Sequence, residues 1–276
     1  MSDEPTAVAG ERETLDPAAQ RRAVRNRYAR IATDSEENAD GCTDSGNCCT
    51  DESSPSGSQE LGYDDADLNA VAEGADLGLG CGNPNAIASL DSGEWVLDLG
   101  SGAGFDCFLA ARAVGESGQV IGVDMTHEMV EKARGNVVKN DATNVEFRLG
   151  EIEHLPVSDE TDDVVISNCV ITLSPTKAQV FRDAYRVLRP GGRLAISDVV
   201  MTASLPDESR ADPESVAACV SGASTVDELR AMLDDAGFHD VGITPKEESE
   251  EFTREWDERI DIERDASRLS LRREPA

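Results

Sequence analysis

The chain carries seven cysteines, and their number and spacing limit the chemistry they can do. They are Cys42, Cys48, Cys49, Cys81, Cys107, Cys169 and Cys219. We expect no secretion signal, because the N-terminal residues lack a basic start and an apolar stretch. An odd count in such a chain argues for reduced thiols rather than a disulfide framework. No Cys-x-x-Cys pair occurs and there are only 3 histidines, so zinc spacing is absent as well. The thiols therefore need another function, and the alternative for each is a small buried apolar side chain.

A second chemical feature is the glycine-rich stretch from Asp98 to Asp106, which follows an apolar run and precedes a helical pattern. Glycines there allow a tight turn and a close approach of the backbone to a ligand. A dinucleotide loop needs Gly-x-Gly-x-x-Gly, and its third glycine would fall on Phe105. The observed Asp-x-Gly-x-Gly-x-Gly resembles instead motif I of class I S-adenosylmethionine methyltransferases. The resemblance implies cofactor contacts from Asp98, Gly100, Ser101, Gly102 and Gly104; the alternative is a plain tight turn.

Polar residues at the ends of the next apolar runs fit the same interpretation. Asp124 lies 24 residues after Gly100 and could accept the ribose hydroxyls of a nucleoside, or simply cap the helix that follows. Glu151 follows the third run, where the resemblance implies a contact with adenine; its alternative is to favour a helix N-terminus. The predicted cofactor set is completed by Met125, Ile152 and Asn168.

These residues must be positioned by alternating strands and helices. Near-continuous apolar runs predict buried parallel strands at 95–100, 119–125, 145–150, 162–168 and 193–200. Helices are expected between them at 104–114, 126–139 and 177–188, and later at 213–221 and 225–236, with Gly237 as a C-cap. Residues 240–245 and 266–273 are expected to supply the last strands. This alternation predicts an α/β fold with a doubly wound, mostly parallel sheet. The resemblance of the glycine loop to motif I implies that the sheet is of the Rossmann-like class I methyltransferase type.

The regions outside this core have their own patterns. A helix is expected over 16–32, with Asp16 as N-cap and Pro17 at its first position, and further short helices at 65–72 and from Asn83-Pro84. The predicted organisation is an N-terminal helix and acidic cysteine-containing loop (1–60) and a lid-like substrate segment (61–94). The methyltransferase core (95–200) and a C-terminal part with helices and the last strands (201–276) follow.

The charge balance excludes several classes of partner. The chain has 56 acidic against 25 basic residues and a net charge of −31. Nucleic acids and anionic membranes attract the opposite sign, so we expect neither as a partner. Acidic residues spread through the chain and only four lysines favour the surface of a halophilic protein, which needs counterions to stay compact. We expect a cytoplasmic monomer.

Longer sequence segments around the cysteines resemble those of one family. GLGCGNP around Cys81, SNCV around Cys169, ACVSGA around Cys219 and VLRPGGRLAISDVV resemble the arsenite methyltransferase family, over about residues 20–245. The resemblance implies a substrate site of cysteine thiolates, formed by Cys81, Cys169 and Cys219 with Cys48 or Cys49 from the N-terminal loop. Thiolates suit trivalent arsenic because soft atoms prefer sulfur ligands. Three sulfurs would leave one lone pair to attack the methyl group of S-adenosylmethionine, and a thiol reductant (thioredoxin or a small thiol) would serve as partner.

Alternatives stay open at this point. Cys107, inside a predicted helix, is expected to be a buried apolar side chain. Cys42, Cys48 and Cys49 lie among carboxylates, which raise the pKa of a thiol. The same fold could methylate carbon or oxygen of a small acceptor such as a quinone, although aromatics make up only 4% of the chain. A non-enzymatic thiol-based arsenic-binding protein is the other alternative, and it leaves the cofactor loop unexplained.

Overall fold

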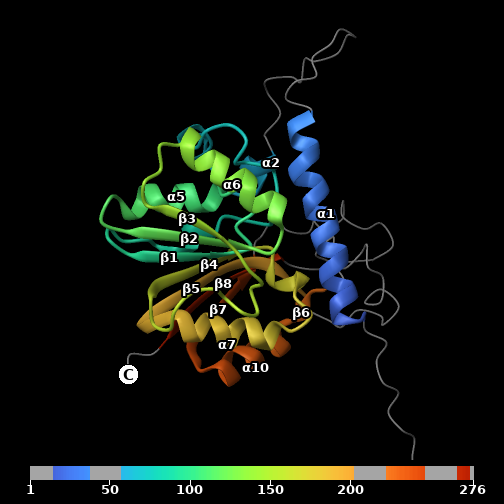
Figure 1. Cartoon of the computed structure of the whole chain (residues 1–276). Helices are drawn as coiled ribbons and strands as arrows, with labels where there is room; N and C mark the ends of the chain where they lie inside the picture. The colour runs from blue at the N-terminus through green and yellow to red at the C-terminus, as the bar shows by residue number, and fades with distance from the viewer. Residues whose placement is uncertain (1–14, 38–56, 202–221, 246–265, 274–276) are drawn as a thin grey trace, which may run out of the picture.

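The computed structural model describes residues 15–37, 57–201, 222–245 and 266–273. A twisted sheet lies at the centre of this part of the chain (Figure 1). Its strands are β1 (Trp95–Leu99), β2 (Gln119–Asp124), β3 (Val145–Leu149), β4 (Asp162–Asn168), β5 (Leu188–Met201), β7 (Phe238–Pro245) and β8 (Ala266–Arg273). Their order is β3-β2-β1-β4-β5-β8-β7, and the two-residue β6 (Ser224–Thr225) pairs with the end of β5. The first five strands are parallel, and β8 is antiparallel to both of its neighbours.

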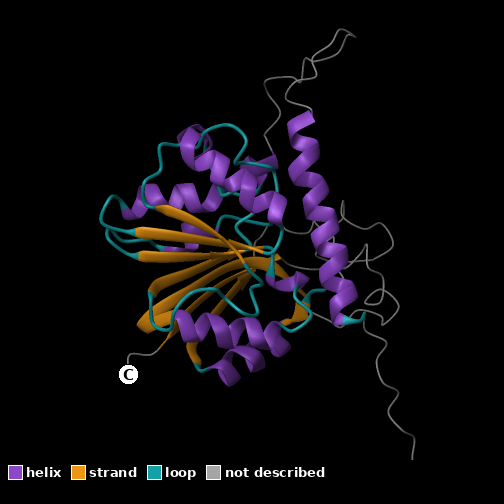
Figure 2. Cartoon of the chain, in the orientation of Figure 1, coloured by secondary structure: helices purple, strands orange, loops and turns teal. Residues whose placement is uncertain are grey.

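Helices cover both faces of the sheet (Figure 2). One face carries α5 (Phe105–Val114) and α6 (His127–Lys139), and the other carries α7 (Lys177–Val187) and α10 (Val226–Ala236). A long helix, α1 (Pro17–Glu37), stands beside the sheet and packs on α6 and on the short η1 (Ile171–Leu173). The remaining short helices are α2 (Gly57–Glu60), α3 (Asp65–Ala70) and α4 (Pro84–Ala88).

Neighbouring residues of each central strand pack into opposite layers, as the pleat of a strand requires. On β1, Val96 packs with Phe108 and Val130 of α5 and α6, whereas Leu97 packs with Phe181 and Leu229 of α7 and α10. Because both faces are covered, these strands read as continuous apolar runs. Among the described residues, no helix combines the length and apolar character needed to span a bilayer.

The fold class predicted from the sequence is confirmed, with differences at element ends. The first helix runs to Glu37, and Asp16 accepts a hydrogen bond from the Ala19 amide (3.0 Å) as predicted for its N-cap. Strand β5 begins at Leu188, five residues before the predicted start, because Leu188 pairs with Asp162 across a register irregularity. The predicted helix at 213–221 lies outside the described residues, whereas the last two strands and the left-handed Gly237 C-cap are confirmed.

Candidate active site

The loop between β1 and α5 forms the floor of the site. Gly100 and Gly102 both have positive φ angles (69° and 52°), which favour glycine. A Cβ on Gly100 would lie 2.4 Å from the Val170 side chain, so this glycine allows close packing. A Cβ on Gly102 would meet no protein atom within 4 Å, so its backbone faces open space where a ligand can approach. Gly104 (φ 97°) packs against Phe147 instead.

Asp124 closes this loop from the end of β2. One carboxylate oxygen accepts the Gly102 amide (3.0 Å) and the other accepts the Thr126 amide (2.8 Å). It therefore holds the glycine loop and the start of α6 together, and a carboxylate with about four acceptor sites still has capacity for ligand hydroxyls. Burial raises the pKa of Asp124, while the two amides oppose that shift.

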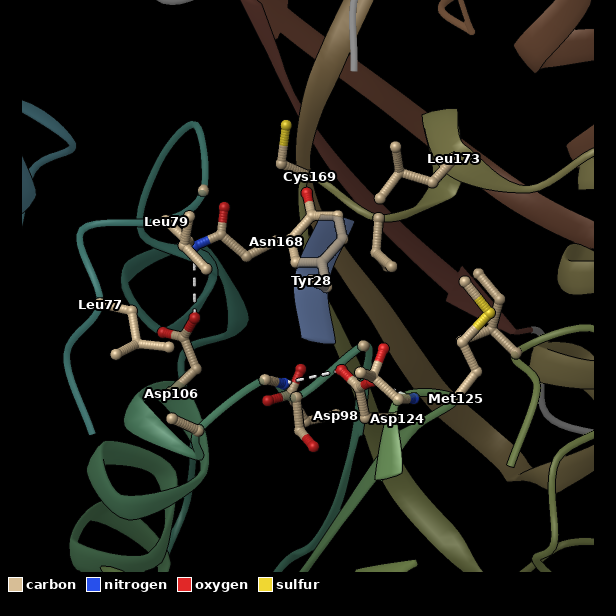
Figure 3. A pocket seen from close by; sticks show the side chains of 18 of the residues that line it. Tyr28, Leu77, Leu79, Asp98, Asp106, Asp124, Met125, Asn168, Cys169 and Leu173 are labelled. Carbon is tan, nitrogen blue, oxygen red and sulfur yellow. Dashed lines mark hydrogen bonds between the residues drawn. The ribbon is translucent and has the colours of Figure 1, made fainter. Parts of the chain in front are cut away.

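A cavity of about 480 Å³ opens above the loop, at the carboxyl ends of the parallel strands (Figure 3). Ligands of doubly wound proteins bind at this edge. Of the residues predicted from the sequence, its wall contains Asp98, Gly100, Ser101, Gly102, Asp124, Met125, Ile152, Asn168 and Cys169.

Three of the predicted residues that the structure describes are not in that wall. Gly104 packs against Phe147, and Cys81 is buried with its sulfur within 4.8 Å of that of Cys169, which does line the cavity. The Glu151 carboxylate pairs with Arg21 (3.4 Å) and Arg25 (3.5 Å) of α1, so it anchors the long helix.

Two further buried carboxylates line the same cavity. Asp106 accepts hydrogen bonds from Tyr63 (2.7 Å), Asn85 (2.8 Å) and Asn168 (3.2 Å), and its pKa is raised to about 6 by burial. Asp98 has a pKa raised well above its usual range by burial and by nearby Asp106. The side chains that hydrogen-bond to Asp98 and Asp106 are a thiol, a phenol and two amides, all of them neutral. These hydrogen bonds therefore do not neutralise the two carboxylates that line the cavity. Such a wall fits a cationic ligand with hydroxyl groups, as S-adenosylmethionine is.

The two described thiols of the predicted acceptor site come together beside this cavity. The sulfurs of Cys81 and Cys169 and a carboxylate oxygen of Asp198 all lie within 4.8 Å of one another, and all three residues are buried. Cys169 has a left-handed backbone (φ 54°), and its amide donates to the Ser197 carbonyl (2.7 Å). The predicted ligands Cys48, Cys49 and Cys219 lie outside the described residues, as does Cys42.

Cys107 is fully buried in α5, as predicted, but it is more than an apolar side chain. Its thiol donates to an Asp98 oxygen at 3.2 Å. Burial and the charge of Asp98 raise the pKa of the Cys107 thiol well above its ordinary value, which keeps it protonated. Cys107 therefore supports the cofactor loop and is not a ligand of the acceptor site.

Sequence reasoning missed Asp198, Tyr63 and Asp106. Asp198 accepts hydrogen bonds from the amides of Ile171 (2.9 Å) and Thr172 (3.3 Å), so it fixes the turn that follows Cys169. Its pKa is raised to about 6 by burial. The predicted β4 and β5 would have placed Asp198 beside Cys169 once paired in parallel, but register across two separate strands is not visible in sequence.

Comparisons with known proteins agree with this geometry. Residues 90–237 match the family model described as a methyltransferase domain. An arsenite methyltransferase of Halobacterium salinarum is 62% identical over 254 residues, which are 90% of this chain and 64% of that protein. The crystal structure of CrArsM, an arsenic(III) S-adenosylmethionine methyltransferase from Chlamydomonas reinhardtii, has a TM-score of 0.60 at 33% identity, covering 80% of this chain and 74% of that one. The chain belongs to the arsenite methyltransferase family.

The resemblance seen in the sequence is thereby confirmed, together with the fold and the cofactor expected of the family. The Homo sapiens arsenite methyltransferase is 42% identical over 153 residues, which are 52% of this chain and 41% of that protein. The chain thus spans about 64% of the length of the Halobacterium arsenite methyltransferase and less of the human one.

Proposed function

We propose that the chain transfers a methyl group from S-adenosylmethionine to trivalent arsenic held by cysteine thiolates, with arsenite as the substrate. The observation that carries this proposal is the pair of buried sulfurs, Cys81 and Cys169, beside a cavity lined by a glycine loop and Asp124. The names of the relatives support the choice of arsenite.

The cofactor side is assigned to the loop at the end of β1. Asp124 would accept the ribose hydroxyls, Gly102 would let the backbone approach, and Asp98 and Asp106 would favour the positive charge of the cofactor. S-adenosylmethionine supplies an electrophilic methyl group on a sulfonium. Met125 and Ile152 line the same cavity and would contact the adenosyl part. Glu151, whose carboxylate is paired with arginines of α1, would contribute to cofactor binding by holding that helix beside the cavity.

On the acceptor side, the thiols of Cys81 and Cys169 would displace two hydroxyl groups of arsenite, which take up the thiol protons and leave as water, so that arsenic is held by two thiolates. We propose Cys219, and Cys48 or Cys49, as sources of a third sulfur. Three sulfurs leave one lone pair on arsenic, which forms the arsenic–carbon bond while the methyl–sulfonium bond breaks and its electron pair stays on sulfur. Orientation of reactants in this way accounts for roughly 7–11 kcal/mol of barrier. Since arsenic is formally oxidised, a thiol reductant, thioredoxin or a small thiol, would return it to the trivalent state.

The proposal also covers the oligomeric state of the protein, its location, its partners and its adaptation to salt. We infer a monomer that works in the cytoplasm, without nucleic-acid or membrane partners, because its net charge of −31 repels both kinds of polyanion. The same charge supports a halophilic protein. Residues 61–94, which contain Cys81, would act as the lid-like acceptor segment of the core at 95–200.

An acceptor screen with labelled S-adenosylmethionine and a thiol reductant tests this function. Arsenite, a demethylated quinone and buffer alone are offered in parallel, and cofactor binding is measured by calorimetry. We expect label in arsenic and in neither control. Label in the quinone would favour a carbon or oxygen methyltransferase, and arsenic binding without cofactor binding would favour a non-enzymatic arsenic-binding protein.

A further inference from the structure

The side-chain amide of Asn168 has both of its ends engaged by the protein. Its oxygen accepts the backbone amide of Cys81 at 3.0 Å. Its nitrogen lies within hydrogen-bond distance of the Gly82 carbonyl (2.8 Å), the Tyr63 hydroxyl (3.0 Å) and Asp106 (3.2 Å, dashed in Figure 3). An amide nitrogen has two protons, and these acceptors already use both. The amide nitrogen therefore has no donor left for a ligand.

This amide connects two thiols that are far apart in the sequence. Asn168 ends β4 immediately before Cys169, whereas Cys81 lies 87 residues from Asn168. The residue adjacent to one sulfur ligand therefore holds the backbone of the other. Tyr63 and Asp106 fix the far end of the amide, so its orientation is set from the cofactor side of the cavity.

The glycines that flank Cys81 make this contact possible. A Cβ on Gly80 would lie 2.6 Å from the Asn168 amide nitrogen, and a Cβ on Gly82 would lie 2.1 Å from the Ser197 hydroxyl. The loop thus lies flat against Asn168 and Ser197 only because both positions lack side chains. Glycines also leave a loop with more conformational freedom to lose, so an external contact is needed to fix Cys81.

We propose that Asn168 is a positioning residue of the acceptor site, which holds the Cys81 sulfur beside the Cys169 sulfur before the substrate arrives. This inference rests on the proposed function for the identity of the substrate, a trivalent thiophilic atom. Two thiols held at a fixed separation bind such an atom as a chelate, which is stronger than binding by one thiol because the second bond forms within one molecule. Asn168 touches the thiol-bearing backbone and not the reacting atoms.

Two substitutions in the same loop separate this role from general loop strain. Gly80→Ala places a methyl group against the Asn168 amide without removing any polar group. Gly78→Ala is the control for a methyl group on this loop, because Gly78 also has a positive φ (63°, against 118° at Gly80) but its Cβ would meet no atom within 4 Å. Asn168→Asp is the third variant: it keeps the oxygen that accepts from Cys81 but loses the donors and places a carboxylate near Asp106. Asn168→Asp thus tests the role without any change of backbone strain at Gly80.

The readout is the affinity for phenylarsine oxide, which bridges two thiols, measured on the full chain with Cys42, Cys48, Cys49 and Cys219 changed to Ser. Cys81, Cys169 and the buried Cys107 remain. We expect Gly80→Ala and Asn168→Asp to weaken binding by about 10- to 100-fold, as loss of chelation does. Gly78→Ala should bind like its parent, and Gly80→Ala should keep the parent affinity for S-adenosylhomocysteine.

The outcomes separate this inference from the proposed function. Parent-like binding of phenylarsine oxide by both Gly80→Ala and Asn168→Asp would overturn the positioning role. So would a parent chain that does not bind it, or an Asn168→Asp variant that loses affinity only for S-adenosylhomocysteine. A wild-type chain that binds arsenicals through Cys81 and Cys169 yet transfers no methyl group would reject the proposed function and leave the positioning role standing.

Discussion

At the scale of single residues, the two sides of the cavity are held in place by different interactions. The cofactor side depends on a carboxylate, Asp124, that ties backbone amides of Gly102 and Thr126 together. The proposed acceptor side depends on Cys169, whose left-handed conformation costs about 1–2 kcal/mol and is held by surrounding hydrogen bonds. One of these bonds runs from the Cys169 amide to the Ser197 carbonyl. The buried Asp198 accepts the Ile171 amide and so fixes the turn that follows Cys169.

Asp124→Ala is expected to weaken binding of S-adenosylmethionine by about 1.5–3 kcal/mol, the value of hydrogen bonds to a charged group. Gly102→Val should also block binding, because its side chain would occupy open space over the loop. Calorimetric titration measures both, with Gly191→Ala as a control that has a positive φ (84°) and an unobstructed Cβ away from the cavity. Wild-type affinity in both cavity variants would place the cofactor elsewhere.

Cys48 and Cys49 are expected to matter more for the methylation of inorganic arsenite than for the methylation of a monomethylated arsenical. Inorganic arsenite has three bonds to fill, whereas a monomethylated arsenic(III) species has two left. The double variant Cys48→Ser, Cys49→Ser should therefore methylate inorganic arsenite poorly and still accept the monomethylated form. A paired assay of both substrates with excess cofactor measures this, and equal loss on both would reject separate roles for the loop cysteines.

At the scale of the elements, β4 begins with a buried carboxyl group, that of Asp162, and ends beside the proposed acceptor site. The Asp162 carboxylate is fully buried and has no hydrogen-bond partner within the described structure. Burial raises its pKa to about 7, with nearby Asp163 adding to the shift and Arg189 and Arg148 opposing it. The folded chain therefore keeps this proton to a higher pH than the unfolded chain does.

Because its folded pKa is raised, Asp162 favours unfolding progressively as the pH rises from about 4 to about 7. Asp162→Asn should remove this penalty and raise the free energy of unfolding at pH 8 by about 1–3 kcal/mol, with little effect near pH 4. Denaturant titrations at the two pH values, in the same molar salt, measure the difference. A variant that is equally or less stable than wild type at pH 8 would contradict this account.

The elements were predictable where a local pattern determines them. Apolar runs marked the core strands, and Asp16, Pro84 and Gly237 marked helix ends, because capping depends on residues close in sequence. The glycine loop between β1 and α5 was predicted for the same reason. Tyr63, Asp106 and Asp198 were not found, since their roles arise from pairings between distant segments. The contact of Asn168 with Cys81 was not predicted, because the two residues lie 87 positions apart in the sequence.

At the scale of the whole molecule, charge is the dominant feature. Acidic residues exceed basic ones by 31, and mutual repulsion of such a surface opposes the compact state. Salt bridges from Arg21 of α1 to Glu151 and Glu153 hold the long helix against the cavity, so some of this excess acidic charge is used in the fold.

Raising KCl from about 0.1 M to about 1 M shortens the Debye length from about 10 to about 3 Å and should weaken this repulsion. We therefore expect the thermal midpoint of unfolding to rise over that range. Scanning calorimetry at a series of KCl concentrations checks it. A midpoint that stays constant or falls would reject the halophilic interpretation.

The central claim is that arsenic is methylated while it is held by the thiols at the end of β4 and in the loop before α4. The most direct measurement incubates wild type and Cys169→Ser with labelled S-adenosylmethionine, arsenite and a thiol reductant, and separates the arsenic species formed. We predict labelled methylated arsenic from wild type and none from Cys169→Ser, with the variant still binding S-adenosylhomocysteine. A Cys169→Ser chain that methylates arsenite at the wild-type rate would contradict the thiolate site.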